Sequence, residues 1–271
     1  MDPDVLLVGC GDLGTDIGLR LAARGHEVLG IRRRAELVPL PVRGLSVDLT
    51  RETPVLPPLD LGYLVVALTA RPRSEESYRA TYVDGMARAL DALAAAGHDP
   101  DRAVLVSSTG VFGDVPTGVL IDESTPPHEP DGPAGMLLAA EQLFAERLPQ
   151  GTVLRLSGLY GSDGGRLAQQ VDDGRVTDPH RWTNRIHRSD AAAAVVHLLT
   201  SEDAPGPLYI GTDDEPCQLG DVAAHLAAQR GAPTPPAADP AQGHGKRMTN
   251  ARLRASGWVP QFPTYREGYP G

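Results

Sequence analysis

Three glycines near the start of the chain have the spacing of a phosphate-binding loop. They are Gly9, Gly11 and Gly14, in the pattern Gly-x-Gly-x-x-Gly. The first permits a tight turn, the second lets the backbone approach a pyrophosphate, and the third lets a helix pack closely on the preceding strand. The first N–H groups of such a helix, here near Asp12 and Leu13, bind phosphate oxygens. The pattern predicts a site for a dinucleotide.

A run of arginines follows at the position that selects between two dinucleotides. About 20 residues after the glycines, an NAD-binding chain carries an Asp or Glu that hydrogen-bonds the ribose hydroxyls. This chain has Arg32, Arg33 and Arg34 there. Guanidinium groups pair with a 2′-phosphate, whereas a carboxylate would repel it. A solvated arginine run is the alternative, but the missing carboxylate favours NADP(H) as the cofactor over NAD(H).

The glycine loop needs a strand before it and a helix after it, and the sequence predicts both. Residues 5–8 form a short apolar run, and Leu13, Ile17 and Leu21 recur at helical spacing until Gly25. Strands are then expected at 27–31, 44–49, 63–68, 103–107 and 152–156, and helices at 75–96 and 134–147. Strands that alternate with helices are typical of parallel β-α-β units.

Beyond residue 157 the pattern becomes irregular. Helices are expected at 189–199, 219–229 and 250–255, with one strand at 208–210 that can return to the sheet edge, and a proline-rich connection covers 233–240. We therefore expect an α/β fold. A doubly wound parallel sheet (a Rossmann domain) spans residues 1–157, and a smaller substrate-side region spans 158–271 and packs over the strand ends, where such folds bind ligands.

Composition excludes several classes of partner. The net charge is −10 and the isoelectric point about 5.2, which argues against a nucleic-acid or anionic-membrane partner. Cys10 and Cys217 form neither a disulfide framework nor a metal-ligand pattern, so no metal is expected. The opening residues are acidic, unlike a secretory leader, and no apolar run approaches the roughly 18 residues of a membrane span. We expect a soluble, cytoplasmic protein that binds a small-molecule substrate; the sequence does not indicate its oligomeric state.

Six short segments occur in an informative order. Besides the glycine loop they are Val-Asp-Leu-Thr at 47–50, Tyr-Val-Asp-Gly at 82–85, Val-Ser-Ser-Thr-Gly-Val-Phe-Gly at 106–113, Leu-Arg-Leu-Ser-Gly-Leu-Tyr-Gly at 154–161 and Arg-Ile-His-Arg-Ser-Asp at 185–190. Together they resemble the extended short-chain dehydrogenases/reductases, also called the NAD-dependent epimerase/dehydratase family. The resemblance implies cofactor contacts at Asp48, Leu49, Leu68, Thr69, Ser107, Leu156 and Gly158, and substrate contacts at Tyr160, Arg185 and His187.

The catalytic pair of that family has no counterpart in the sequence. The family uses Tyr-x-x-x-Lys, whose lysine lowers the pKa of a tyrosine acid. An alignment on Glu141 places Pro133 at the tyrosine and Leu137 at the lysine, and the only lysine of the chain is Lys246.

Two hydroxyls remain as candidate catalytic groups. Ser108 and Thr109 can hydrogen-bond a substrate carbonyl or imine, or can simply satisfy backbone groups at a strand end. Tyr160 and His187 are further candidate acids, although either can be a packing residue instead. Arg185 can grip an anionic substrate or can be one surface arginine among many.

Two functions fit these observations. The first is an NADP(H)-dependent oxidoreductase or epimerase-like enzyme with a non-standard active site, acting on a small molecule that tolerates the missing tyrosine. The second is an NADP(H)-binding sensor or regulatory protein without turnover. We favour the enzyme because the serine-rich strand and the substrate-side motif both persist beside the missing pair.

Overall fold

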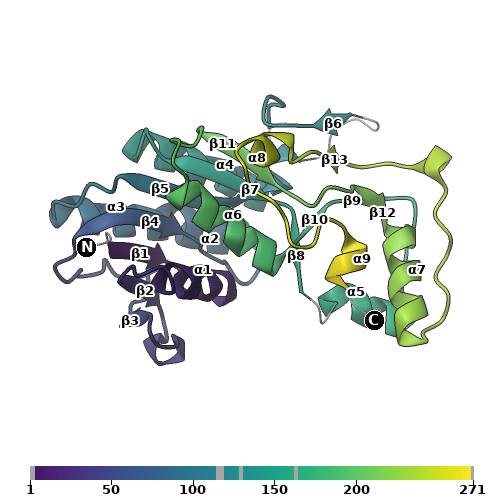
Figure 1. Cartoon of the computed structure of the whole chain (residues 1–271), viewed down its shortest axis with the longest axis horizontal. Coiled ribbons are helices and arrows are strands. Elements are labelled where there is room, and N and C mark those ends of the chain that lie inside the picture. The colour runs from purple at the N-terminus through teal and green to yellow at the C-terminus, as the bar shows by residue number, and fades with distance from the viewer. Residues whose placement is uncertain (1–3, 114–118, 128–130, 162–163, 270–271) are drawn as a thin grey trace. The chain divides into compact units, whose positions relative to one another are not determined.

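A parallel sheet dominates the first part of the fold (Figure 1). The computed structural model describes residues 4–113, 119–127, 131–161 and 164–269. Within them, seven strands form one sheet in the order β11-β7-β5-β4-β1-β2-β3. The strands are β1 (Asp4–Val8), β2 (Val28–Arg32), β3 (Arg43–Ser46), β4 (Leu61–Val66), β5 (Arg102–Ser108), β7 (Thr152–Leu156) and β11 (Leu208–Gly211). The order changes direction between β1 and β4, which is the doubly wound topology expected from the sequence.

The strands of this sheet run in one direction. The pairings that join β3, β2, β1, β4 and β5 are all parallel. At the other edge the Val153 N–H donates to Pro207 O, and the Ser157 N–H donates to Gly211 O, each at 2.9 Å. Both partners advance by four residues, so β7 and β11 are also parallel. The strand expected at 208–210 is thus β11, at the edge of the sheet.

Helices connect the strands, and short strands lie outside the main sheet. The helices are α1 (Asp12–Ala22), α2 (Glu75–Tyr78), α3 (Met86–Ala95), α4 (Gly132–Arg147), α5 (Gly165–Asp172), α6 (Arg188–Thr200), α7 (Leu219–Arg230), α8 (Ala251–Ala255) and α9 (Tyr265–Gly268). The short strands pair as β8 (Gly158–Tyr160) with β10 (Arg185–His187), β9 (Trp182–Thr183) with β12 (Cys217–Gln218), and β6 (Leu120–Ile121) with β13 (Arg247–Met248). The helix expected over 75–96 is present as one helical stretch, but a π-helical segment that was not predicted, Arg79–Gly85, lies within it between α2 and α3.

The sheet is covered on both faces, which explains why β1 is a continuous apolar run. Leu6 and Val8 belong to the same buried cluster as Met86 of α3 and Phe144 of α4. Leu7 points the other way, toward α1, where its side chain lies against Gly18. Alternate residues of a strand face opposite sides of a sheet, so each residue of β1 packs under a helix layer.

The chain divides into two compact units that are not contiguous in sequence. The first unit comprises residues 1–111, 129–155 and 192–209, and the second comprises 112–128, 156–191 and 210–271. Two segments therefore cross the boundary expected at residue 157, namely 112–128 and 192–209. The second unit has its own core, in which Tyr160, Cys217 and Tyr265 are buried with Val222 and Leu226.

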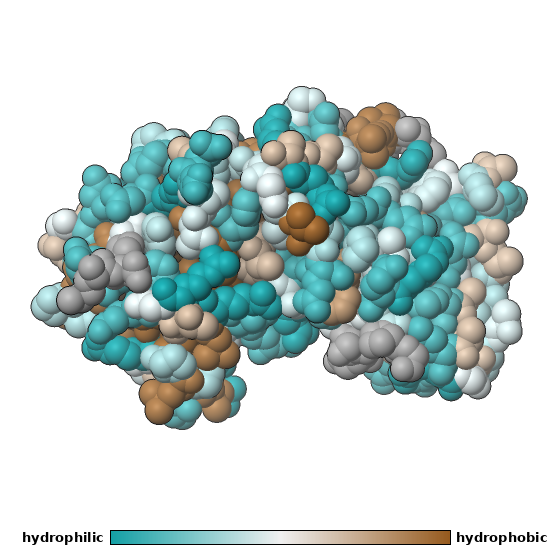
Figure 2. All heavy atoms as spheres, viewed as in Figure 1, coloured by the Kyte–Doolittle hydropathy of each residue, from teal (hydrophilic) through white to brown (hydrophobic). Residues whose placement is uncertain are grey.

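Polar residues cover most of the visible surface in Figure 2, with apolar atoms gathered beside β3. There Leu37 and Leu40 are 48% and 87% exposed. None of the helices in the described ranges has the length and apolarity to cross a membrane. Across the same residues, no three His, Cys, Asp or Glu side chains are grouped as metal ligands.

Candidate functional site

The glycine loop joins β1 to α1, and its three glycines meet different demands. Gly9 has φ +100°, a conformation that favours glycine, and a Cβ there would overlap the Ala67 carbonyl. A Cβ on Gly14 would overlap the Gly9 carbonyl, so the helix and the loop are in close contact. A Cβ on Gly11 would meet no atom within 4 Å. The fold therefore does not need glycine at position 11, and the open space beside it fits a ligand that approaches the backbone.

The start of α1 presents N–H groups toward that space. Gly11 is the N-cap of α1, and no side chain of the described residues caps it. The first backbone bond of the helix runs from the Thr15 N–H to the Gly11 carbonyl at 2.8 Å. The preceding N–H groups, including those of Asp12 and Leu13, lie at the positive end of the helix dipole. This end of α1 can hold a pyrophosphate.

A cavity of about 880 Å³ opens at this point, at the carboxyl ends of β1, β2 and β4. Its volume falls within the range of pockets that hold small ligands and cofactors. Eight of the residues predicted for the cofactor line it: Gly9, Gly11, Arg32, Arg33, Asp48, Leu49, Leu68 and Thr69. Asp12, Leu13, Gly14 and Ser107 are not among its lining residues. All of its lining residues belong to the first unit.

The cavity also has a side that was not predicted from the sequence. It is formed after β4 and along α2 and the π-helical segment, by Arg71, Pro72, Ser74, Glu76, Ser77, Ala80 and Thr81. The position of β4 next to β1 could have indicated these residues, because a strand at the switch point delivers its following loop to the ligand. Tyr82 holds this loop, since its hydroxyl accepts a hydrogen bond from the Ala70 N–H at 3.4 Å.

Positive charge predominates in the cavity of an otherwise acidic chain. Four arginines line it, Arg32, Arg33, Arg34 and Arg71, against two carboxylates, Asp48 and Glu76. The hydroxyl of Thr50 donates to Asp48 and lowers the pKa of that carboxyl, with smaller contributions from its backbone N–H, Arg33 and Arg51. Asp48 is therefore ionised at neutral pH and can accept hydrogen bonds from an amino group.

The hydroxyls at the end of β5 have different surroundings. The Ser107 hydroxyl is 2.5 Å from Glu141 Oε1, and the same carboxylate accepts from Arg155 Nη2 at 2.7 Å. Glu141 and Arg155 are 6% and 5% exposed, so the Ser107 hydroxyl takes part in a buried ion-pair network. The Ser108 Oγ accepts from the Gly110 N–H at 3.1 Å, which leaves its own proton available for donation. Thr109 begins a short 3-10 helix and is 9% exposed.

The two positions aligned with the family's catalytic pair lie on α4. Pro133 is in the first turn of that helix, and Leu137 is buried in it. Lys246, in the second unit, donates from Nζ to the Gly113 carbonyl at 2.7 Å.

Tyr160 and His187 face each other in the second unit. They are paired in register across β8 and β10, and their rings meet edge to face at 5.2 Å. The Tyr160 ring also contacts Tyr269 at 4.5 Å, and its hydroxyl donates to Thr264 O at 3.5 Å. Burial, followed by the negative charge of Asp213, raises the pKa of Tyr160 far above its ordinary value. The raised pKa makes Tyr160 a weaker acid than an exposed tyrosine, and its ring packs in the core of the second unit.

Arg185 lies beside a buried carboxylate that the sequence analysis did not single out. Arg185 is 6% exposed and Asp213 is 2% exposed, and the Asp213 N–H donates to the Arg185 carbonyl at 2.7 Å. Neither Asp213 carboxylate oxygen makes a hydrogen bond of good geometry with a described residue. Burial raises the pKa of Asp213 to about 8, against the opposing effects of the Arg185 guanidinium and the Glu215 backbone N–H. Little in the sequence indicated Asp213, because it is one of several acidic residues between β11 and β12.

The remaining predicted residues are also in the second unit. Leu156 ends β7 and is buried, whereas Gly158 begins β8 and donates its N–H to Asn184 O at 3.2 Å. Asp190, from the predicted Arg-Ile-His-x-x-Asp segment, accepts from the N–H groups of Gln261 and Phe262 at 2.8 and 2.9 Å. Asp190 thus holds the C-terminal segment of the chain in place.

Comparison with known proteins identifies this architecture. Residues 5–211 match the NAD dependent epimerase/dehydratase family. The chain belongs to that family. This agrees with the resemblance noted in the sequence, and it establishes a fold and a class of NAD(P)-dependent, oxidoreductase- or epimerase-type proteins.

Three relatives show how far the similarity extends. A solved structure from Methylobacillus flagellatus, named for the NAD-dependent epimerase/dehydratases, is 36% identical with a TM-score of 0.82, over 98% of this chain and 96% of that one. Protein YeeZ of Escherichia coli is 30% identical over 72% of each chain. The dTDP-6-deoxy-L-talose 4-dehydrogenase (NAD(P)+) of Kitasatospora kifunensis is 26% identical over 76% of this chain and 73% of its own.

Proposed function

We propose that this epimerase/dehydratase-family protein is an NADP(H)-dependent oxidoreductase that acts on a carbonyl or imine of a small molecule without a tyrosine–lysine pair. The observation that carries the proposal is the arginine-lined end of the cavity, where Arg32 and Arg33 follow β2. No carboxylate lies at the end of β2 itself, at the position that binds the ribose hydroxyls of NAD. The dehydrogenase among the relatives is named for both NAD and NADP, which supports a family able to use either.

The preference for the phosphorylated cofactor follows from charge. Arg32 is partly buried and its Nη1 reaches the Leu37 carbonyl only at 3.5 Å, so most of its donors are open to a ligand. Guanidinium and phosphate form short, charge-assisted bonds, and each is stronger than a bond between neutral groups. We expect NADPH to bind at least tenfold more tightly than NADH, which corresponds to about 1.4 kcal/mol.

Fluorescence titration of both cofactors tests this preference. Arg32→Asp should narrow or invert it, because the new carboxylate repels the 2′-phosphate and accepts from the ribose hydroxyls. The control is Arg43→Asp, at a side chain that is 58% exposed and outside the cavity. Equal affinities of the wild-type protein for NADPH and NADH would contradict the proposal.

The proposed chemistry rests on positioning and on hydrogen bonding. NADP(H) supplies or accepts the hydride when it is bound. The Ser108 hydroxyl retains a proton that it can donate to a substrate oxygen or nitrogen, and Thr109 is its neighbour. Unaided hydroxyls are weak acids, so we expect imines, activated alkenes or other reactive acceptors to be reduced faster than simple ketones.

A substrate panel followed by loss of NADPH absorbance tests this chemistry. The double variant Ser108→Ala, Thr109→Val should lower turnover at least tenfold and leave the affinity for NADPH within about twofold. Rapid ketone reduction with a bell-shaped pH profile would show that a stronger acid is present. Turnover that is unchanged in the double variant would remove the two hydroxyls from the mechanism.

A further inference from the structure

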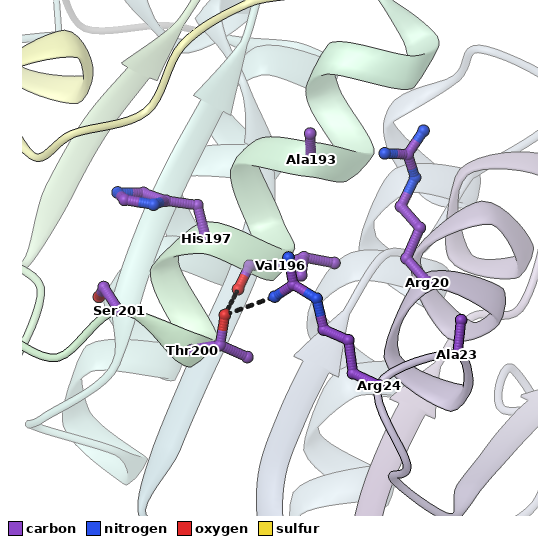
Figure 3. Close-up of a pocket in the computed structure, with 8 residues that line it drawn as sticks. All are labelled: Arg20, Ala23, Arg24, Ala193, Val196, His197, Thr200 and Ser201. Carbon is purple, nitrogen blue, oxygen red and sulfur yellow. Dashed lines mark hydrogen bonds between the residues drawn. The ribbon is translucent and has the colours of Figure 1, made fainter.

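A second cavity lies in the first unit, away from the dinucleotide site. It has a volume of about 370 Å³ and is bordered by the C-terminal end of α1 and by α6 from Ala193 onward (Figure 3). Arg20, Ala23, Arg24, Ala193, Val196, His197, Thr200 and Ser201 line it. None of these residues lines the larger cavity. Ala23 and Ala193 have small side chains, which leave the space between the two helices open.

The lining of this cavity is basic. Its lining residues include two arginines, a histidine, a threonine and a serine, and none of the described ones is a carboxylate. The hydroxyl protons of Thr200 and Ser201 go to the carbonyls of Val196 and Asp203. Arg20 is partly neutralised by Asp16, one turn earlier on α1, at 2.8 Å. Arg24 has no acidic partner among the described residues, in a chain whose net charge is −10. A cavity with two arginines and no carboxylate among its described lining residues attracts an anion.

Arg24 is exposed, but one end of its guanidinium is bonded to α6. Its Nη1 donates to Thr200 Oγ1 at 2.7 Å, and that hydroxyl donates to the Val196 carbonyl at 2.9 Å (Figure 3). One arm of the guanidinium is therefore fixed, while the rest of its planar set of donors remains available. A fixed fork of this kind matches two oxygens of a phosphate.

The end of α6 would repel an anion if its carbonyl groups were left open. Arg102 removes this obstacle, because its Nη1 donates to the carbonyls of Leu199 and Ser201 at 3.2 and 2.6 Å. The same guanidinium reaches the Ser201 hydroxyl at 3.3 Å. A third arginine thus neutralises the helix terminus that borders the cavity.

We propose that the cavity between α1 and α6 is a binding site for a phosphate group, either inorganic phosphate or the phosphate of a small phosphomonoester. Its volume suits a ligand smaller than a dinucleotide. Arg24 pairs with two phosphate oxygens, and Arg20 adds a second positive charge to the cavity. The Thr200 hydroxyl, whose proton goes to the Val196 carbonyl, keeps Arg24 in place. α1 begins at the pyrophosphate loop and this site lies at its opposite end, about 18 Å away by the rise of a helix.

Isothermal titration with inorganic phosphate and with glycerol phosphate tests the proposal. The wild-type protein should bind at least one of the two, and Arg24→Ala should weaken that binding at least tenfold. Arg43→Ala removes the same charge from an exposed position and should leave the affinity within about twofold. Tighter binding of glycerol phosphate would assign the site to a phosphomonoester, and tighter binding of inorganic phosphate would assign it to the free ion.

Two further measurements keep the result specific to this cavity. Thr200→Val keeps the shape of the side chain, removes the hydroxyl that fixes Arg24, and should also weaken phosphate binding. Arg24→Ala should bind NADPH as tightly as the wild type does. The phosphate titration does not require NADPH, so it tests the cavity between α1 and α6 even if the larger cavity does not bind a dinucleotide. Phosphate binding that is equal in wild type and Arg24→Ala, or absent from the wild type, would overturn the proposal.

Discussion

At the scale of single residues, the glycines of the phosphate-binding loop differ in purpose: Gly14 is required by the packing of the fold, and Gly11 leaves room for a ligand. A methyl group on Gly14 overlaps the Gly9 carbonyl, whereas a methyl group on Gly11 enters open space. Gly11 also has φ −80°, which any residue can adopt. The two glycines should therefore respond differently to the same substitution.

We predict that Gly11→Ala leaves the free energy of unfolding within about 0.5 kcal/mol of the wild-type value, as for an uncrowded position. The same variant should lose at least tenfold in dinucleotide affinity, because the added methyl group occupies space beside the pyrophosphate site. Gly14→Ala, unlike Gly11→Ala, should also lower the melting temperature, because its added methyl group overlaps the Gly9 carbonyl. Thermal denaturation and NADPH titration of both variants check this, and a strongly destabilised Gly11→Ala would show that glycine is needed there for folding.

Asp213 links stability to pH. Its pKa is about 8 in the folded protein, above the ordinary value of 3.8. Between these values the folded chain retains a proton that the unfolded chain has released. The free energy of unfolding should therefore fall as pH rises through this window, by up to about 1.4 kcal/mol per pH unit from this residue.

Asp213→Asn should remove that contribution while preserving size and shape. Chemical denaturation at pH 5, 6, 7 and 8 measures the free energy of unfolding, which should fall less steeply with rising pH in the variant than in the wild type. Below pH 3.8 both states are protonated, so the two proteins should converge in their pH dependence there. If the free energy of unfolding of the two proteins changes equally with pH between pH 5 and 8, Asp213 is ionised in the folded protein.

At the scale of elements, α4 carries one buried and one exposed ion pair. Glu141 and Arg155 are almost fully buried, whereas Arg147 and Asp91 have side-chain exposures of 36% and 60%. Removal of one partner of a buried pair leaves the other charge buried without a counter-ion, which lowers the free energy of unfolding by about 3–5 kcal/mol. An exposed pair contributes only about 0–1 kcal/mol to that free energy. Glu141→Ala should thus be far more destabilising than Asp91→Ala, and urea denaturation of the two variants checks the order.

The elements also show what a single sequence can and cannot predict. The strands and helices of the first unit were predictable because β1 is a continuous apolar run, α1 has apolar residues at helical spacing, and glycines mark their ends. The π-helical segment before α3 was not, because no proline or glycine interrupts residues 75–84 and Tyr82 makes its hydrogen bond to the loop at Ala70. The short strands β8 and β10 were missed since three residues show no periodicity. In the site, the phosphate loop was predictable from spacing, but Arg71 and Asp213 reach their positions only through tertiary structure.

At the scale of the whole molecule, the two units share the chain in alternating segments. Residues 192–209, which include most of α6 and the start of β11, pack into the first unit although the chain has already passed through the second. Val195, Leu198 and Leu199 are fully buried there, so their removal exposes a large apolar surface.

We predict that a fragment of residues 1–157 does not fold by itself, despite its match to the domain boundary expected from sequence. Circular dichroism of this fragment should show no cooperative thermal transition, whereas the full chain should show one. The matched control is a chain in which residues 192–209 are appended to residue 155 through a flexible linker. A cooperative transition in the shorter fragment would show that α6 and β11 are dispensable for the first unit.

Lys246 gives the molecule one lysine among its 25 basic residues. Its ammonium group is bonded to the Gly113 carbonyl, and the next two residues form β13 against β6. A protease that cuts only after lysine can therefore cleave this chain at one peptide bond, releasing residues 247–271. The cut requires this segment to leave β6, so the rate of appearance of the fragment under native conditions measures how often the C-terminal segment opens. Asn184→Ala removes bonds to the Lys246 carbonyl and the Met248 N–H and should accelerate the cleavage.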